Sequence, residues 1–364
     1  MDPAVRANAS VLAAILAAFI AAGVPAACAG EGQDAKAPAS LEEQMQALSS
    51  ALAESFNGGD WDMLELAAGG AKAAGLKGQD LEVFALRSER DAALAGFGAK
   101  NRIILWGLAF RAKLGDERAA AALRTKALAR IEPAKMPQAG GGGGASDWAA
   151  WQKYQGELTD RANALLALGL LGDKDAGRTA WEALQAAEPS AWSYVPTLTQ
   201  AVLAADKDEG WKKLFGLCAD EAADFARRTA VFGALAGLAG GDRPGNRGQA
   251  FRVEGRLAKL LPADAAKELR ATFVRLAGKF PEGAESFKCG GLTTGAGVLP
   301  GFAEDQAAMD ALKGLKGRVK GQPGRSWDMM IDGVLRNLGQ PVAGVAKPAQ
   351  PVNPAPQPGP KETF

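Results

Sequence analysis

Histidine is absent from the whole 364-residue chain, and tyrosine occurs only twice. Without histidine the chain lacks the usual zinc ligand, the usual general base near neutral pH, and any Ser-His or Cys-His nucleophile pair. Isoleucine and threonine are also scarce, whereas alanine and leucine dominate. Because β-branched residues favour strands and alanine and leucine favour helices, this composition predicts an all-α fold.

Net charge is nearly absent as well, since 42 Lys and Arg balance 41 Asp and Glu. The chain therefore has no global field that would attract nucleic acid or an acidic substrate, and we expect no nucleic-acid partner. Carboxylates are plentiful, but no spacing singles out a catalytic pair. The sequence assigns no catalytic residue, no metal site and no cofactor.

The first 29 residues have the three parts of a secretory signal peptide. A short start carrying Arg6 leads into an apolar run over residues 11–24, and small residues follow at 26–30. The apolar run is short for a membrane span. We therefore expect export to the periplasm or cell envelope, with an uncleaved anchor as the alternative.

The end of this leader allows two kinds of processing. Ala27-Cys28-Ala29 suits a signal peptidase that reads small residues. Pro25-Ala26-Ala27-Cys28 resembles the lipobox of bacterial lipoproteins, which implies a lipid on Cys28, although Pro25 stands where that family usually has leucine. We expect membrane contact only through such an N-terminal lipid or through an uncleaved anchor.

Two cysteines remain in the chain beyond the leader, Cys218 and Cys289. An exported protein reaches a compartment that permits disulfides. The sequence leaves two alternatives open, a Cys218–Cys289 disulfide and two separate thiols.

A short motif that separates helical stretches recurs along the chain. Asp173-Lys-Asp-Ala-Gly177 returns 33 residues later as Asp206-Lys-Asp-Glu-Gly210, and the next Gly-Asp turn follows after a further 36. This is the period of helical-hairpin repeats. In such a turn glycine ends one helix and aspartate caps the next, so we assign a structural turn role to four aspartates. They are Asp116, Asp173, Asp206 and Asp242.

The strings Ala-Leu-Gly-Leu-Leu-Gly-Asp-Lys-Asp-Ala and Ala-Leu-Ala-Gly-Leu-Ala-Gly-Gly-Asp resemble HEAT-like repeats of the phycobilisome-lyase type, over about residues 100–260. The resemblance implies an α-solenoid of stacked helical hairpins and a scaffolding or partner-binding role. It implies no lyase activity, because no site residues accompany it. In such a stack each helix pair covers the apolar face of its neighbour.

Composition shifts divide the chain further. Five consecutive glycines at 140–144 cannot sit in a helix, and seven prolines fall within residues 341–360. A capping box at Ser40–Glu43 marks the first helix start. We therefore predict a signal peptide (1–29), a tether (30–39), N-terminal helical repeats (40–131), a Gly-rich flexible loop (132–146), HEAT-like repeats (147–280), a C-terminal irregular and helical region (281–339) and a disordered Pro-rich tail (340–364).

Two segments have the composition of binding sites. Gly290–Gly297 looks like a phosphate loop but lacks the Lys and Ser/Thr that follow the second glycine of a Walker motif, so we expect an irregular loop there. A basic run could contact anionic lipid or polymer, or form a solvated connection. Its members are Lys313, Lys316, Arg318, Lys320 and Arg325.

Seven aromatic residues form the candidate binding site. If several point to one side of the helix stack, they form an apolar groove for a protein or peptide, and otherwise they belong to the core between helices. The seven are Trp148, Trp151, Tyr154, Trp181, Trp192, Tyr194 and Trp211.

These observations favour an exported cell-envelope scaffold that binds a protein or peptide partner on its helical surface. One alternative is a histidine-independent α/α enzyme that uses Asp and Glu as acid and base on an envelope polysaccharide. A structural spacer is the other alternative. Facing carboxylates with shifted pKa values would favour the enzyme, and an exposed aromatic surface would favour the scaffold.

Overall fold

The computed structural model describes residues 61–73, 100–134, 145–187, 194–241, 250–282, 289–319 and 322–339. Within these ranges the chain forms thirteen helices and no strand, which confirms the all-α fold class. The predicted signal peptide with Cys28, the tether, most of the Gly-rich loop and the Pro-rich tail lie outside the described residues.

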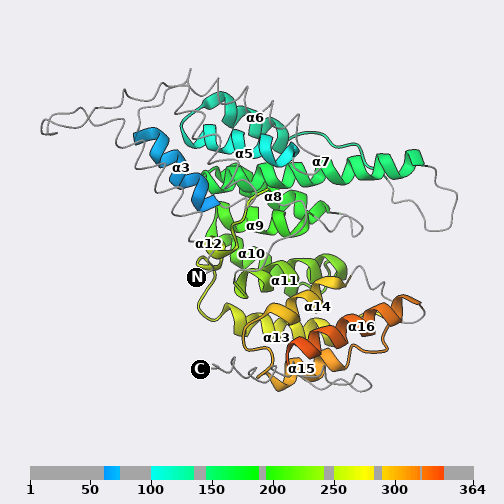
Figure 1. Cartoon of the computed structure of the whole chain (residues 1–364). Helices are drawn as coiled ribbons and strands as arrows, with labels where there is room; N and C mark the ends of the chain where they lie inside the picture. The colour runs from blue at the N-terminus through cyan, green and yellow to red at the C-terminus, as the bar shows by residue number, and fades with distance from the viewer. Residues whose placement is uncertain are drawn as a thin grey trace, which may run out of the picture.

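The helices follow one another in space in roughly their sequence order, from α3 at one end to α15 and α16 at the other (Figure 1). Their bounds are α3 Trp61–Ala73, α5 Lys100–Lys113, α6 Glu117–Ala127, α7 Ala145–Leu170, α8 Lys174–Ala186, α9 Val195–Ala205, α10 Lys207–Ala219, α11 Phe225–Ala239, α12 Glu254–Ala258, α13 Ala265–Gly278, α14 Gly290–Val298, α15 Gln306–Lys313 and α16 Gln322–Asn337.

Neighbouring helices contact one another in two series. The helices α5, α7, α9, α11, α14 and α16 each contact the next member of this series. On one side of the series α6 packs on α7, α8 on α9, and α10 on α11, while α13 contacts α11, α14 and α15. Successive members of the series therefore cover part of one another's apolar surface.

The turns between paired helices have the geometry that the Gly-Asp motif predicts. Gly115 and Gly172 have φ angles of 85° and 89°, in the left-handed region where glycine has no Cβ penalty. Asp116 and Asp173 follow them and accept hydrogen bonds from the second and third N–H groups of α6 and α8. Asp206 caps α10 through the N–H of Glu209. Asp242 lies outside the described residues.

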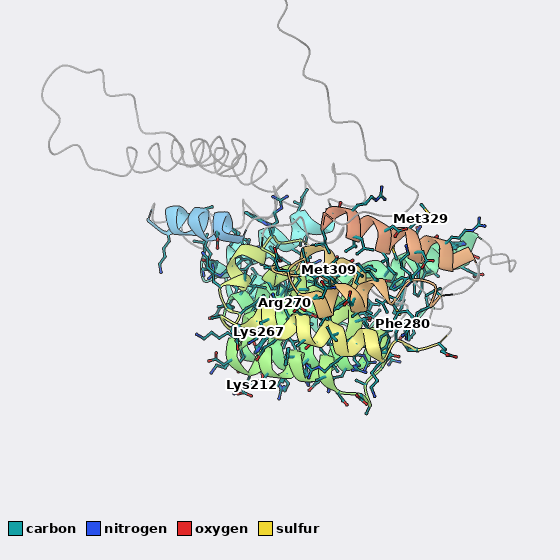
Figure 2. The ribbon with its side chains drawn as sticks, turned by 90° about the horizontal axis from the view of Figure 1, so that it is seen from below. Lys212, Lys267, Arg270, Phe280, Met309 and Met329 are labelled. Atoms are coloured by element: carbon teal, nitrogen blue, oxygen red, sulfur yellow. The ribbon has the colours of Figure 1, made fainter. Side chains whose placement is uncertain are left out.

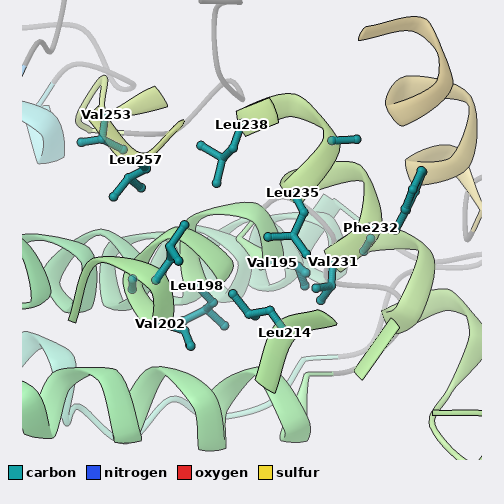
Figure 3. Packing of buried hydrophobic residues seen from close by; sticks show 14 of the residues in the cluster. Val195, Leu198, Val202, Leu214, Val231, Phe232, Leu235, Leu238, Val253 and Leu257 are labelled. Carbon is teal, nitrogen blue, oxygen red and sulfur yellow. The ribbon is translucent and has the colours of Figure 1, made fainter. Parts of the chain in front are cut away.

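One continuous hydrophobic core extends along the stack. On α8 the buried residues Ala176, Ala180 and Leu184 recur every four positions, so they share one helix face. Figure 3 shows the central part of this core, where side chains of α9, α10, α11 and α12 point toward one another. Leucine, valine and alanine fill most of it, and short alanine side chains let the helices approach closely.

Residues 250–258 depart from the pattern of consecutive helix pairs because they return from α11 to earlier parts of the chain. The N–H of Ala250 donates to the Asn163 side-chain oxygen of α7 at 2.8 Å. The Phe251 ring packs edge-on against Trp61 of α3, with 5.2 Å between centroids. This segment, which includes α12, therefore holds α3 against the stack.

The Gly-rich stretch Gly290–Gly297, which its composition predicts to be an irregular loop, lies in helix α14, so that prediction was wrong. Glycine is a poor helix former on its own. Here, however, α14 lies directly against α11, and a Cβ added to Gly291 would collide with the backbone oxygen of Thr229. The two helices can come this close only because these glycines have no side chain. The packing gained in the contact compensates for the low helix propensity of glycine.

Candidate functional site

Helix α7 is longer than its neighbours and one end of it projects. It has 26 residues, against 11 in α6 and 13 in α8, which makes it about 39 Å long. The Arg161 side chain reaches the carbonyl of Ala127 at the end of α6, so the residues before about 160 extend past α6. Figure 1 shows this end beyond the neighbouring helices α5, α6, α8 and α9. We call residues 145–160 the α7 arm.

Three of the predicted aromatic residues lie on the α7 arm at three-residue spacing. Trp148 is 44% exposed, whereas Trp151 and Tyr154 are each only 8% exposed. The rings of Trp151 and Tyr154 contact each other, with centroids 5.7 Å apart. The arm therefore presents one large aromatic side chain to solvent beside two buried ones.

The other predicted aromatic residues do not extend this exposed surface. Tyr194 and Trp211 are buried, and Trp181 is half buried. Tyr194 precedes α9 and Trp211 follows it, so the length of α9 separates them, and Trp211 stacks on Phe215. Trp192 lies outside the described residues. Among the described members of this set, Trp148 is exposed, Trp181 is half buried and the other four are buried.

Cys218 and Cys289 are both buried, and they are not joined in a disulfide in the structure. The Cys218 thiol instead lies 3.7 Å from the carbonyl oxygen of Arg228, whose guanidinium donates to the Cys218 carbonyl. Burial raises the pKa of the Cys218 thiol to about 12, although the positive charges of Arg228 and Arg275 oppose this shift. The thiol is therefore protonated and unreactive at neutral pH.

A charged cluster ties α3 to α5 and α12. Glu65 forms ion pairs with Lys113 at 2.7 Å and Arg256 at 2.6 Å, and Arg256 also contacts Asp62 at 3.1 Å. Burial alone would raise the pKa of Glu65, but the hydrogen bonds and charges of Lys113 and Arg256 outweigh it and lower the pKa to about 2. Glu65 is therefore ionised at neutral pH.

The pKa of Asp116 is also lowered. Partial burial opposes this shift, but hydrogen bonds from the N–H of Ala119 and from Arg111 outweigh it. A general acid at neutral pH needs a raised pKa, so neither Asp116 nor Glu65 is suited to be the general acid of the enzyme alternative. Both carboxylates instead hold helices in place.

Within the part of the chain that the structure describes, no set of three or more potential metal-binding side chains comes together. In the same residues, no helix has the length and apolar character needed to cross a membrane.

Two contributors to the structure were not identified from the sequence. Asn163 is an isolated polar residue in an Ala-Leu helix, a pattern that gives a weak signal for its buried hydrogen bond to Ala250. Met329 is 71% exposed beside Met330 on α16, where the amphipathic spacing of Trp327 and Ile331 could have placed it on the outer face.

No family model, no curated protein and no solved structure matches the chain. The resemblance to HEAT-like repeats therefore stays a prediction from the sequence.

Proposed function

We propose that the chain is an exported interaction scaffold, an α-solenoid that holds a protein or peptide partner at the α7 arm. The solenoid part of this proposal is supported by the ordered contacts of α5, α7, α9, α11, α14 and α16 and by the Gly-Asp turns at Asp116 and Asp173. Export is proposed from the signal-peptide pattern of residues 1–29.

The observation that carries the binding role is the exposure of Trp148 at 44% on the projecting end of α7. Tryptophan is enriched among the residues that dominate binding energy at protein interfaces, and its ring buries a large apolar area on contact. Trp151 and Tyr154 are buried next along the same helix, so they provide a firm support for this end of the arm.

The charges of the α7 arm favour recognition by apolar contact. Lys153 lies 3.8 Å from Glu157 one turn further along, and both side chains are solvent-exposed, so this pair contributes little binding energy. In the exposed end of the arm, residues 146–150, the charged side chain is that of Asp147, which is next to Trp148. We therefore expect a partner that offers an apolar cleft for Trp148.

A photo-crosslinking experiment in intact envelopes tests the proposal. A photoreactive residue replaces Gln152, which is exposed and lies one turn from Trp148 on the same face. We expect a discrete crosslinked partner, whose recovery falls about 30-fold when Trp148→Ala is added, the ratio that corresponds to a loss of about 2 kcal/mol at a hot spot.

The matched control is Leu128→Ala, which removes another exposed apolar side chain at the end of α6. We expect this variant to leave crosslinking unchanged. Circular dichroism must show native helix content in both variants. Equal recovery of the partner with Trp148 and with Trp148→Ala would contradict a binding role for the arm.

A further inference from the structure

The last helix exposes two methionines on its outer side. Trp327, Ile331 and Leu335 recur every four residues and are buried. Met329 and Met330 are 71% and 40% exposed, and they belong to the few large apolar side chains that are exposed in the described residues. In Figure 2 Met329 lies at the outer edge of α16.

Positive side chains share this outer face. Arg325 and Arg336 are four residues before and seven residues after Met329, spacings that place all three on one side of the helix. Both arginines are exposed. Arg325 forms no ion pair with any residue that the structure describes. The outer face of α16 thus has an apolar centre and cationic flanks.

The turn between α15 and α16 provides hydrogen-bond partners for both acidic residues of this helix, and a positive charge for one of them. The N–H of Gly317 donates to Asp328 at 2.9 Å, and Lys316 pairs with Asp332 at 2.7 Å. Lys313 at the end of α15 and Arg318 in the turn are exposed and make no ion pair within the described residues. Positive charge is therefore left in excess around Met329.

Sequence composition points the same way. Residues 313–336 contain six basic and two acidic side chains, although the whole chain has a net charge of only +1. Lys320, one of the six, lies outside the described residues. Positive charge is therefore concentrated between the last residue of α15 and the end of α16, whereas α15 itself carries the exposed Asp310.

We infer that the outer face of α16 docks on an anionic phospholipid surface. Guanidinium and ammonium groups pair with lipid phosphates, and flexible methionine side chains enter between the headgroups. The exposed methionines lie beside exposed arginines on this face, an arrangement that suits the apolar boundary and the phosphates of an anionic membrane. This inference does not depend on the α7 arm.

A single weak site of this kind gives reversible binding, and stable attachment to a membrane takes two signals. The docking surface therefore complements an N-terminal attachment. Without that attachment, we expect membrane binding that depends strongly on salt. Docking through α16 would hold one end of the helix stack against the membrane. The α7 arm lies toward the other end of the stack (Figure 1).

The test measures partition of the exported Cys28→Ser chain, which carries no N-terminal lipid, onto vesicles. One set contains phosphatidylglycerol and phosphatidylcholine, and the other contains phosphatidylcholine alone. We expect preferential binding to the anionic vesicles. Each basic side chain near such a surface contributes about fivefold, so Arg325→Gln combined with Arg336→Gln should lower the partition coefficient roughly 25-fold. Added salt should weaken the binding of the parent chain.

The charge-matched control is Lys174→Gln combined with Lys207→Gln, two exposed lysines at the starts of α8 and α10. This variant and Trp148→Ala should bind anionic vesicles like the parent. Met329→Ser should lower binding on anionic vesicles while its helix content stays native. Equal binding to both kinds of vesicle, or binding unaffected by the arginine substitutions, would overturn the inference. Loss of an envelope protein partner by the arginine variant, with vesicle binding intact, would assign the face to a protein instead.

Discussion

Gly233 of α11 and Gly291 of α14 lie so close that a Cβ added to Gly233 would be 2.8 Å from the Gly291 Cα. The same contact continues along both helices, because a Cβ on Gly240 would collide with the Val298 carbonyl oxygen. Backbone therefore packs directly on backbone near both ends of α14, at Gly291 and at Val298. Any side chain in this contact must push the two helices apart.

This geometry predicts opposite effects for two glycines of the same helix. Gly233→Ala should lower the free energy of unfolding by about 1–3 kcal/mol, because the added methyl group overpacks the contact. Gly237 has open space around its position. Gly237→Ala should therefore raise the free energy of unfolding by about 0.5–1 kcal/mol through its better helix propensity.

Urea unfolding followed by circular dichroism at 222 nm measures both values. The parent chain and the two variants should share the same m value, so that differences in midpoint report stability. Similar midpoints for Gly233→Ala and Gly237→Ala would show that α11 and α14 are not in backbone contact.

The same helix pair shows why part of the fold could not be predicted from sequence. The turns at Asp116 and Asp173 were predictable, because a glycine and an aspartate in adjacent positions specify the left-handed end and the cap locally. Helix α14 was not, because glycine lowers helix propensity residue by residue, and the compensation comes from α11, which is distant in sequence. Local signals therefore specified turns but not this contact.

The candidate site was predictable to a similar extent. Three-residue spacing placed Trp148, Trp151 and Tyr154 on one helix, but the same spacing serves a core face and an exposed face equally. Which ring is exposed depends on the tertiary packing around the arm, and helical spacing alone does not specify that packing. The return of residues 250–258 to Asn163 also lies beyond sequence reasoning, because it depends on one pairing across 87 residues.

Glu65 predicts a specific acid dependence of stability. Its pKa is about 2 in the folded protein and 4.5 without the fold, because Lys113 and Arg256 stabilise the carboxylate more than burial disfavours it. Between these pH values the native state binds fewer protons than the unfolded state, so stability rises with pH. The stabilisation is complete above about pH 4.5 and is lost as the pH falls toward 2.

Glu65→Gln should therefore be less stable than the parent at pH 7, and the difference should shrink as the pH is lowered from 4.5 toward 2. Urea unfolding at closely spaced pH values measures it. Glu182→Gln provides the control, since Glu182 is exposed on α8 and makes no ion pair within the described part of the chain. A stability difference for Glu65→Gln that is independent of pH would contradict the ion-pair explanation.

The two thiols beyond the leader predict the outcome of a labelling experiment. Cys218 and Cys289 are buried, and burial raises the Cys218 pKa to about 12 against the charges of Arg228 and Arg275. A thiol reagent needs both access and thiolate. In the folded Cys28→Ser chain we therefore expect neither cysteine to react with iodoacetamide at pH 8, and both to react in urea without reductant. Mass spectrometry counts the labels.

A chain that unfolds in urea yet takes up no label must contain the Cys218–Cys289 disulfide, whereas rapid labelling before unfolding would mean that this end of α10 opens readily. Labelling of a buried thiol in the folded chain is limited by how often the fold opens. Arg228 of α11 contacts Cys218, so Gly233→Ala, which weakens the packing of α11, should speed the labelling of Cys218.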